Sequence, residues 1–291
     1  MNILKAVNLR KIYGQGETEV KALDGVNLEV EKGEFVAIVG TSGSGKSTML
    51  HMIGGLDNPT SGQVIVDGQN LSHMTDEKLT IFRRRNIGFV FQQYNLVPML
   101  NVWENIVLPV KLDGKKVEKG YVDEIIDTLG IRTKLENLPS ALSGGQQQRV
   151  AIARALGMEP EFLVADEPIA SLDVSIQAQI VNLFRHLQEE HGFTFLFIAH
   201  DLAMVEYLCD RVGVMYHGKL VELAPSEELY SNPVHPYTKT LLSAIPVPDP
   251  IRERKRVLQY YDGEGMENSV WTEVSPGHFA MLPAEGKGGS I

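Results

Sequence analysis

Hydrophobic and polar positions change their spacing several times along the chain, and these changes outline its elements. Residues 1–33 alternate apolar and polar side chains around glycines, which predicts antiparallel strands. Continuous apolar runs of strand length follow, as is typical of strands buried on both faces of a parallel sheet: "EFVAIVG", "NIGFVFQ", "EFLVADE" and "FTFLFIAHD". Because helical patterns separate these runs, we expect βαβ crossovers and an α/β core. "SGQVIVDGQNL" and "RVGVMYHGKLVEL" predict further strands beside turns.

The spacing becomes mostly helical between Pro98 and Pro160, which predicts a helical insertion within the α/β core. We therefore assign residues 1–94 and 161–224 to the core, residues 95–160 to the insertion and residues 225–291 to a C-terminal extension. From about residue 250 onward no clear period remains, so irregular strands or a partly ordered tail are expected there.

Composition narrows the class of protein. The 291 residues are 43% hydrophobic and 22% charged, which are ordinary values for one or two globular domains. The net charge of −10 argues against a nucleic-acid-binding surface, and the single cysteine, Cys209, excludes an intrachain disulfide. The start lacks the apolar run of a secretion signal, and no stretch of roughly 18–20 apolar residues occurs. We expect a soluble cytoplasmic protein that reaches a membrane only through a partner.

The segment "GTSGSGKST" fits the pattern of a phosphate-binding loop, because it follows a buried strand and opens a helical pattern. Gly43 and Gly45 let the backbone wrap around oxygens, Lys46 supplies charge to the outer phosphates, and the Ser47 hydroxyl is a Mg²⁺ ligand. The residues predicted to bind nucleotide here are Gly40, Thr41, Ser42, Gly43, Ser44, Gly45, Lys46, Ser47 and Thr48.

Two carboxylates end the apolar run "FLVADEP". Asp166 is placed to hold the hydrated Mg²⁺, and Glu167 is placed to orient and polarise the attacking water. Positioned base catalysis of this kind contributes about 10²–10⁴-fold to a rate.

Three single residues have two interpretations each. His200 follows a buried strand and could contact the γ-phosphate or fix the water, although a histidine at a strand end is more often structural. Gln92 could reach Mg²⁺ or water, or simply mark the end of its strand. Tyr13 could stack on a purine or end a strand beside a turn. The run Arg83–Arg85 suggests a phosphate patch, but we favour a solvated helix end that complements the helix dipole.

The segment "LSGGQQQR" looks like a second phosphate loop without a lysine. Ser143 can cap the helix that begins there and Gln146 can reach back, which is the pattern of a capping box. Together with Gly144 and Gly145 these residues could approach a nucleotide, but only from another direction, since they belong to the helical insertion. We infer that the segment serves the nucleotide of a second subunit, an arrangement that two-fold symmetry makes reciprocal.

These motifs, in this order, resemble the nucleotide-binding subunit of an ATP-binding cassette (ABC) transporter. "GTSGSGKST" is similar to its Walker A motif, "FQQ" to its Q-loop, "LSGGQ" to its signature, "FLVADE" to its Walker B motif, "SLD" to its D-loop and "IAHD" to its H-loop. The resemblance implies a P-loop NTPase (RecA-like) core and a dimer closed around two ATP. It also implies Tyr13 as the adenine-stacking residue and places Asp173 of the D-loop at the nucleotide.

The same resemblance implies an ATP-hydrolysing, Mg²⁺-dependent subunit that drives a separate membrane permease and lies at the inner face of the cell membrane. The expected cargo is a peptide, lipoprotein or drug, and neither the direction of transport nor a homo- or heterodimer follows from the residues. An alternative is a mechanical regulator of cell-wall hydrolases in division. No nucleic-acid partner is expected.

Two parts of the chain resemble different transporters. Residues 1–156 are similar to ATPases of lipoprotein-release and macrolide-export systems, whereas residues 157–291, with "NPVHPYTKTLLSAIPVPDP", are similar to oligopeptide or dipeptide importer ATPases. This predicts a seam near residues 156–161, whether natural or engineered. Since the family contacts its permease around the Q-loop and the helical insertion, we expect the first part to decide which permease is bound.

Overall fold

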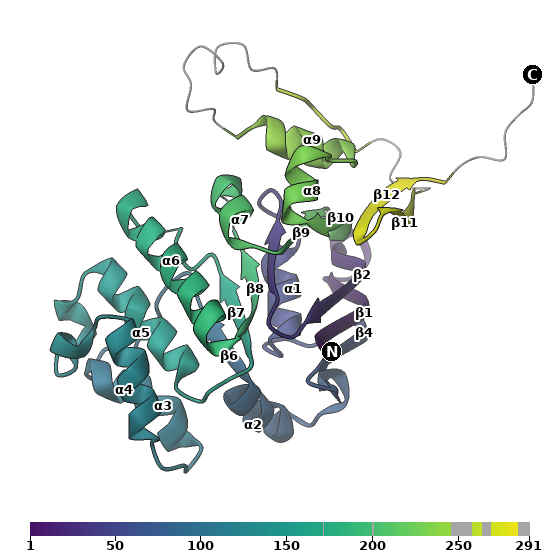
Figure 1. The fold of residues 1–291 in the computed structure, drawn as a ribbon. Coiled ribbons are helices and arrows are strands. Elements are labelled where there is room, and N and C mark those ends of the chain that lie inside the picture. The colour runs from purple at the N-terminus through teal and green to yellow at the C-terminus, as the bar shows by residue number, and fades with distance from the viewer. Residues whose placement is uncertain (171, 200, 246–257, 264–268, 285–291) are drawn as a thin grey trace, which may run out of the picture.

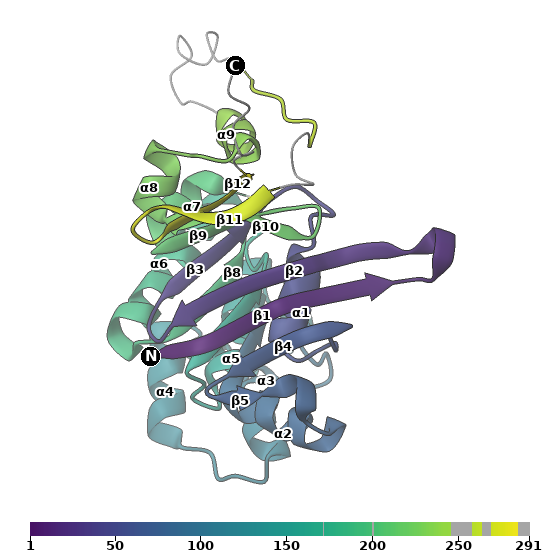
Figure 2. The same cartoon turned by 90° about the vertical axis from the view of Figure 1, so that its right-hand side faces the viewer.

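Two sheets and the surrounding helices make up the part of the chain that the structure, a computed structural model, describes: residues 1–170, 172–199, 201–245, 258–263 and 269–284 (Figure 1). The first sheet is antiparallel, with strand order β2-β1-β4-β5. Its strands are β1 (Asn2–Tyr13), β2 (Val20–Glu31), β4 (Ser61–Val66) and β5 (Gln69–Asn70). The β1–β2 pair runs well beyond its neighbours as a two-stranded ribbon (Figure 2).

The second sheet has the order β11-β12-β10-β9-β3-β8-β7-β6, and its strands from β9 to β6 are parallel. They are β3 (Phe35–Val39), β6 (Ile87–Val90), β7 (Phe162–Asp166), β8 (Thr194–Ile198), β9 (Arg211–Tyr216), β10 (Lys219–Pro225), β11 (Ser269–Ser275) and β12 (His278–Pro283). The helices are α1 (Lys46–Ile53), α2 (Asp76–Asn86), α3 (Val102–Leu112), α4 (Lys119–Thr128), α5 (Gly144–Leu156), α6 (Val174–His191), α7 (Leu202–Leu208), α8 (Ser226–Ser231) and α9 (Pro236–Ser243).

The central strand β3 is covered on both faces, which explains its unbroken apolar sequence. Val36 and Ile38 join a core that includes α1 and the antiparallel sheet, whereas Ala37 and Val39 join a second core beneath helices such as α5 and α6. Every residue of β3 is at most 1% exposed. The predicted fold class, a parallel α/β core with an N-terminal antiparallel sheet and inserted helices, is confirmed.

The inserted helices α3, α4 and α5 pack beside β6 and α6 (Figure 1). A capping box fixes the start of α3, where Asn101 accepts from the Glu104 amide (2.8 Å) and Glu104 accepts from the Asn101 amide (3.0 Å). The assigned boundaries at 94/95 and 160/161 fall between elements, and they remain predictions.

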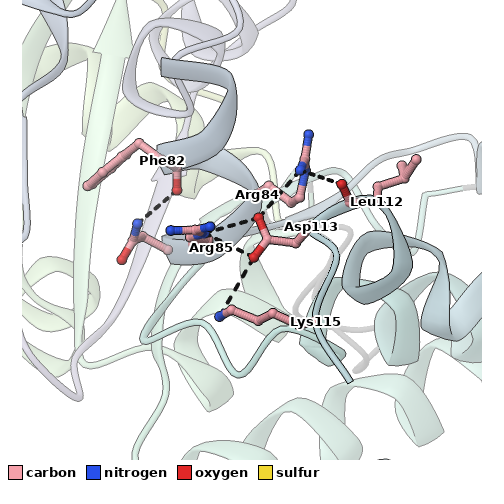
Figure 3. Close-up of polar contacts among 7 residues, drawn as sticks. Phe82, Arg84, Arg85, Leu112, Asp113 and Lys115 are labelled. Carbon is pink, nitrogen blue, oxygen red and sulfur yellow. Dashed lines mark hydrogen bonds and ion pairs between the residues drawn. The ribbon is translucent and has the colours of Figure 1, made fainter. Parts of the chain in front are cut away.

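The arginines at the end of α2 keep solvent contact in its last turn, with side chains 25% (Arg84) and 49% (Arg85) exposed, as a solvated helix end requires, and they also share an ionic partner. Arg84 and Arg85 both pair with Asp113, at 3.4 and 3.0 Å, and Lys115 lies 3.8 Å from the same carboxylate (Figure 3). The Asp113 side chain is 1% exposed, and its hydrogen bond with Arg85 lowers its pKa. The cluster therefore ties the end of α2 to the end of α3.

The tail contains a paired β-hairpin where irregular strands or a partly ordered tail were expected. Strands β11 and β12 form an antiparallel hairpin that pairs with β10, with Ala280 opposite Glu222. Most side chains of β11 are exposed whichever way they point, so no alternation marks it as a strand. The rest of the expected irregular tail, 246–257, 264–268 and 285–291, lies outside the described residues.

Candidate nucleotide site

The loop between β3 and α1 has a backbone that only glycine adopts readily. Gly40, Gly43 and Gly45 have φ of 149°, 78° and 101°. A Cβ on Gly45 would lie 2.4 Å from the Ala22 carbonyl oxygen, and one on Gly40 would lie 2.3 Å from the Met215 carbonyl oxygen. The loop therefore lies directly against neighbouring backbone, and its shape depends on these glycines.

The N-terminus of α1 is suited to anions. No side chain caps it, because Gly45 is its N-cap residue, so its first amides are available to phosphate oxygens. Lys46 is 5% exposed, and its ammonium donates to the carbonyls of Gly40 (2.8 Å) and Thr41 (2.9 Å). Burial lowers the pKa of Lys46, while Glu167 and Asp166 act in the opposite direction.

Two oxygen groups that suit a hard cation meet beside this helix. The Ser47 hydroxyl donates to Asp166 at 3.3 Å, and Asp166 ends β7. They converge because β3 and β7 flank β8 in the parallel sheet, so that their carboxyl ends share one edge. Burial raises the pKa of Asp166, against the effect of His51, whose Nε2 lies 3.9 Å away. A hydroxyl and a carboxylate are protein ligands that Mg²⁺ accepts alongside phosphates and water.

A cleft of about 530 Å³ opens in front of the loop. It is lined by Glu19, Val20, Lys21, Ala22, Ser42, Gly43, Gly45, Lys46, Ser47, Thr48, Glu167 and His217. Glu167 enters the cleft with a positive φ of 46°, a strained conformation for this residue type, and its amide donates to the Ile198 carbonyl at 3.2 Å. The predicted water-orienting carboxylate thus shares one cavity with Lys46 and Ser47.

Tyr13 lies at the edge of this cleft rather than in its lining. Its partner across the β1–β2 ribbon, Val20, is 60% exposed and lines the cleft. The Tyr13 hydroxyl donates to Asp57 at 3.0 Å, and the ammonium of Lys11 lies 5.1 Å from the ring centre. Stacking of an adenine on Tyr13 remains a prediction.

The signature segment forms the predicted capping box. The Ser143 hydroxyl accepts from the Gln146 amide (3.4 Å), and the Gln146 side chain accepts from the Ser143 amide (3.0 Å). Added Cβ atoms on Gly144 and Gly145 would lie 2.8 Å from the Tyr94 hydroxyl and 2.7 Å from an Ile176 methyl. The segment does not line the cleft, so within one chain its glycines serve packing.

The remaining predicted residues are not brought to the cleft of this chain. Gln92 follows β6 with an exposed side chain, and Asp173 is an exposed N-cap of α6 whose side chain accepts no capping hydrogen bond. Neither lines the cleft, so their predicted contacts with nucleotide, and that of Gln92 with Mg²⁺, stay predictions. His200 and the first residue of the D-loop, Ser171, lie outside the described residues.

Two contacts at the site were missed from the sequence. His217, which has a φ of 44°, lines the cleft from the turn after β9. Tyr237 of α9 binds the phosphate loop, because its hydroxyl accepts from the Thr41 amide at 2.9 Å. The spacing of residues along the chain does not predict contacts between segments so far apart. His217 and the contact of Tyr237 with Thr41 nevertheless lie at the edge of the sheet where the parallel strands end.

A glycine loop after the central strand, an uncapped helix with a buried lysine and a strand-end aspartate define a P-loop nucleotide-binding protein. The family model described as "ABC transporter" matches residues 23–170, and "Oligopeptide/dipeptide transporter, C-terminal region" matches residues 221–263. The chain belongs to the ABC transporter family of ATP-binding proteins and is one of its ATPases.

Curated relatives cover nearly the whole chain. The oligopeptide transport ATP-binding protein OppF of Bacillus subtilis (strain 168) is 46% identical, over 96% of this chain and 95% of the relative. The dipeptide transport ATP-binding protein DppF of Lactococcus lactis subsp. cremoris (strain MG1363) is 41% identical, over 96% of this chain and 93% of the relative. Since single relatives of one kind cover 96% of the chain, the comparisons give no support to the predicted seam.

Solved structures agree on the fold. The dimeric structure of MJ0796, a bacterial ABC transporter cassette, matches with a TM-score of 0.70 and 39% identity, over 77% of this chain and 98% of that one. CbiO1 from Clostridium perfringens, part of the ABC transporter complex cbiONQ, matches with a TM-score of 0.71 and 32% identity, over 79% of this chain and 91% of that one. Among the described residues, no helix is both long and apolar enough to cross a membrane.

Proposed function

We propose that this chain is the ATP-hydrolysing subunit of a peptide transporter, working in a dimer and driving a separate membrane permease. One observation carries the chemistry: Lys46, Ser47 and Glu167 face a single cleft, and Asp166 accepts the Ser47 hydrogen bond at its side. The amides of the phosphate loop and Lys46 hold the triphosphate, while Ser47 and Asp166 hold Mg²⁺. Held by these two residues, Mg²⁺ would supply stabilisation of the charge on the phosphates.

Glu167 acts on the water in this proposal. Its carboxylate follows Asp166 directly and faces the cleft, where it accepts a hydrogen bond from the attacking water and orients it. Tyr13 at the edge of the cleft provides a ring for the adenine. His200 and Gln92 are the proposed further polar contacts to the γ-phosphate, water or metal.

The signature completes the site in trans. Its capped helix start does not line its own chain's cleft, and the dimeric form of the cassette MJ0796 supports a second copy as the recipient. In this proposal Ser143, Gly144, Gly145, Gln146 and Asp173 of one subunit close over the triphosphate of the other. Two such sites form at once because the arrangement is two-fold symmetric.

A groove beside the Q-loop is the proposed seat of the permease. It holds about 340 Å³, and its lining includes Phe89 and Phe91, whose rings stack at 4.3 Å, together with Pro109 and Met158. Arg154 of α5 also lines it and donates to the carbonyls of Tyr94 (3.0 Å) and Asn95 (2.6 Å). The signature helix and the Q-loop exit are therefore held together at this groove, which suits transmission of closure to a membrane partner.

The proposed cargo is a peptide. The relatives are named for oligopeptide and dipeptide transport, and the match to the C-terminal region of such transporters covers residues 221–263. These names do not favour lipoprotein release, drug export or control of cell-wall hydrolases. In this proposal the subunit lies peripherally on the inner face of the cell membrane, bound through its permease.

The test is the substitution Glu167→Gln, with Glu161→Gln as a matched control at the other end of β7. We expect Glu167→Gln to bind ATP, to lose about 10²–10⁴-fold in turnover, to accumulate a dimer by light scattering, and to stop peptide uptake into vesicles carrying the permease. Glu161, whose exposed carboxylate pairs with Lys32 at 2.7 Å, should tolerate the change. Wild-type turnover, or a monomer at saturating Mg·ATP, would contradict the proposal.

A further inference from the structure

A tyrosine of the C-terminal extension holds the first turn of the phosphate loop. The Tyr237 hydroxyl accepts from the Thr41 amide (2.9 Å) and donates to the Thr41 hydroxyl (3.0 Å), and the side chain of Tyr237 is buried, at 4% exposure. The carbonyl of Thr41 accepts from the Lys46 ammonium at 2.9 Å. Thr41 thus links the tyrosine directly to the lysine that faces the triphosphate.

Buried contacts fix the position of Tyr237. Its amide donates to Nδ1 of His235 at 3.1 Å, which caps α9, and its ring centre lies 4.3 Å from that of Tyr216. The amide of His235 donates to Glu222 of β10 at 2.9 Å, and His278 of β12 lies 2.7 Å from the same fully buried carboxylate. The hydroxyl is therefore held by the sheet and by the C-terminal hairpin, independently of any nucleotide.

We propose that Tyr237 is a positioning residue for nucleotide binding: the C-terminal extension sets the phosphate loop, and through Thr41 the position of Lys46. The inference rests on the proposed ATP site, and neither family match assigns a role to this residue. A loop that is ordered before the ligand arrives loses less conformational freedom on binding. Because the hydroxyl touches no reacting atom, it should affect ATP affinity far more than the rate at saturation.

The test is Tyr237→Phe, with Tyr216→Phe as a matched control. Tyr216 belongs to the same aromatic cluster, and no hydrogen bond of its hydroxyl occurs within the described residues. We expect Tyr237→Phe to weaken ATP binding about fivefold, the value of one ordinary hydrogen bond, with kcat within about twofold of wild type. Hydrogen exchange in residues 40–46 of the nucleotide-free protein should speed up in Tyr237→Phe but not in Tyr216→Phe.

Wild-type ATP affinity and wild-type exchange in a folded Tyr237→Phe protein would overturn the inference, as would equal losses in both variants. If Tyr237→Phe does not fold, Thr41→Ala tests the same contact from the loop side. It removes one of the two hydrogen bonds and should weaken ATP binding about two- to threefold, whereas unchanged affinity would contradict the inference. If the wild-type chain binds no ATP, the proposed function is refuted instead. Hydrogen exchange is measured on the nucleotide-free protein, so it tests the effect of Tyr237 on the loop whether or not ATP binds.

Discussion

Two helices of this chain begin at glycine-rich segments, and their N-termini are built in opposite ways. At α1 the N-cap residue is Gly45, no side chain caps the helix, and the first amides face a cleft. At α5 the N-cap residue is Ser143, and a complete capping box with Gln146 satisfies the amides of Ser143 and Gln146. The first start is suited to a ligand of its own chain, whereas the second is stable without one.

The glycines at the two helix starts are also needed for different reasons. Gly45 has a φ of 101° and lies against the carbonyl of Ala22, so both its conformation and its space exclude a side chain. Gly145 has an ordinary helical conformation, and the nearest atoms to an added Cβ belong to the flexible Ile176 side chain. Similar glycine patterns therefore mark a nucleotide cradle in one place and close packing of helices in the other.

The largest expected effect comes from removing the charge at the first helix. Lys46→Ala should weaken ATP binding by about 10- to 100-fold, the value of hydrogen bonds to a charged group, and abolish turnover. Isothermal titration with Mg·ATP measures the affinity. Lys32→Ala, which removes an exposed lysine paired only with Glu161 among the described residues, is the control and should bind as wild type. Unchanged affinity for ATP in Lys46→Ala would mean that the start of α1 is no better suited to a ligand of its own chain than the start of α5.

Substitution at the second helix should separate binding from turnover. Ser143→Arg removes the cap and adds bulk where the second subunit's triphosphate would lie. A single chain should still bind ATP normally. Turnover should fall more than about 100-fold, which is within the range that positioned catalytic groups contribute. Loss of ATP binding by the monomer would show instead that the signature serves its own chain.

Mixing the two inactive variants sharpens this test. A heterodimer of Lys46→Ala and Ser143→Arg subunits contains one site in which both Lys46 and Ser143 are intact, if the sites are shared between chains. Random pairing would then restore up to about a quarter of the wild-type sites. If each chain completed its own site, the mixture would stay inactive.

A smaller effect distinguishes the two kinds of glycine. In Gly45→Ala the alanine must adopt the left-handed conformation of the native loop, which costs about 1–2 kcal/mol. Its methyl also overlaps a backbone oxygen, so both the free energy of unfolding and the affinity for ATP should fall. Gly145→Ala meets a side-chain methyl that can shift, and the helix propensity of alanine offsets about 1 kcal/mol of an overpacking cost of about 1–3 kcal/mol, so its loss in the free energy of unfolding should be the smaller one. Urea denaturation measures both, and equal losses would mean that the glycines have the same role.

The sequence predicted what depends on local pattern and on parallel-strand topology. Buried apolar runs specify the strands, and because their carboxyl ends share one edge, Lys46, Ser47 and Asp166 could be placed together in advance. Gln92 and Asp173 could be identified only by their motifs, and their exposed side chains contact no part of the cleft in a single chain. The proposed role of Asp173 depends on a second subunit and that of Gln92 on the bound nucleotide or metal, and no periodicity encodes either.

The contact of Tyr237 with Thr41 could not be predicted, because it joins positions 196 residues apart. Its geometry depends on the buried carboxylate Glu222 and on His278, which enters from the C-terminal hairpin. A charged residue within an apolar strand pattern suggests a buried polar cluster, but it does not identify the partners. Apolar periodicity is therefore informative for the sheet core and uninformative for the tail that supports the phosphate loop.

The smallest expected effect concerns a third helix N-terminus, at α9, where the cap can titrate. His235 accepts the Tyr237 amide at Nδ1, so the cap needs the neutral ring, and burial lowers the pKa of His235 against the opposing effect of Glu222. The unfolded chain, with a histidine pKa of about 6.5, then binds the proton first, so stability is complete above that pH and declines below it.

His235→Asn keeps a capping oxygen but does not titrate, so it isolates this effect. Other groups face the same place, Glu222 from β10 and His278 from β12, and they remain in both proteins. The free energy of unfolding should match wild type at pH 7.5 and decline less than wild type between pH 6.5 and 5, as followed by urea denaturation at each pH. An equal decline in the two proteins would mean that protonation of the His235 cap does not contribute to the loss of stability at low pH.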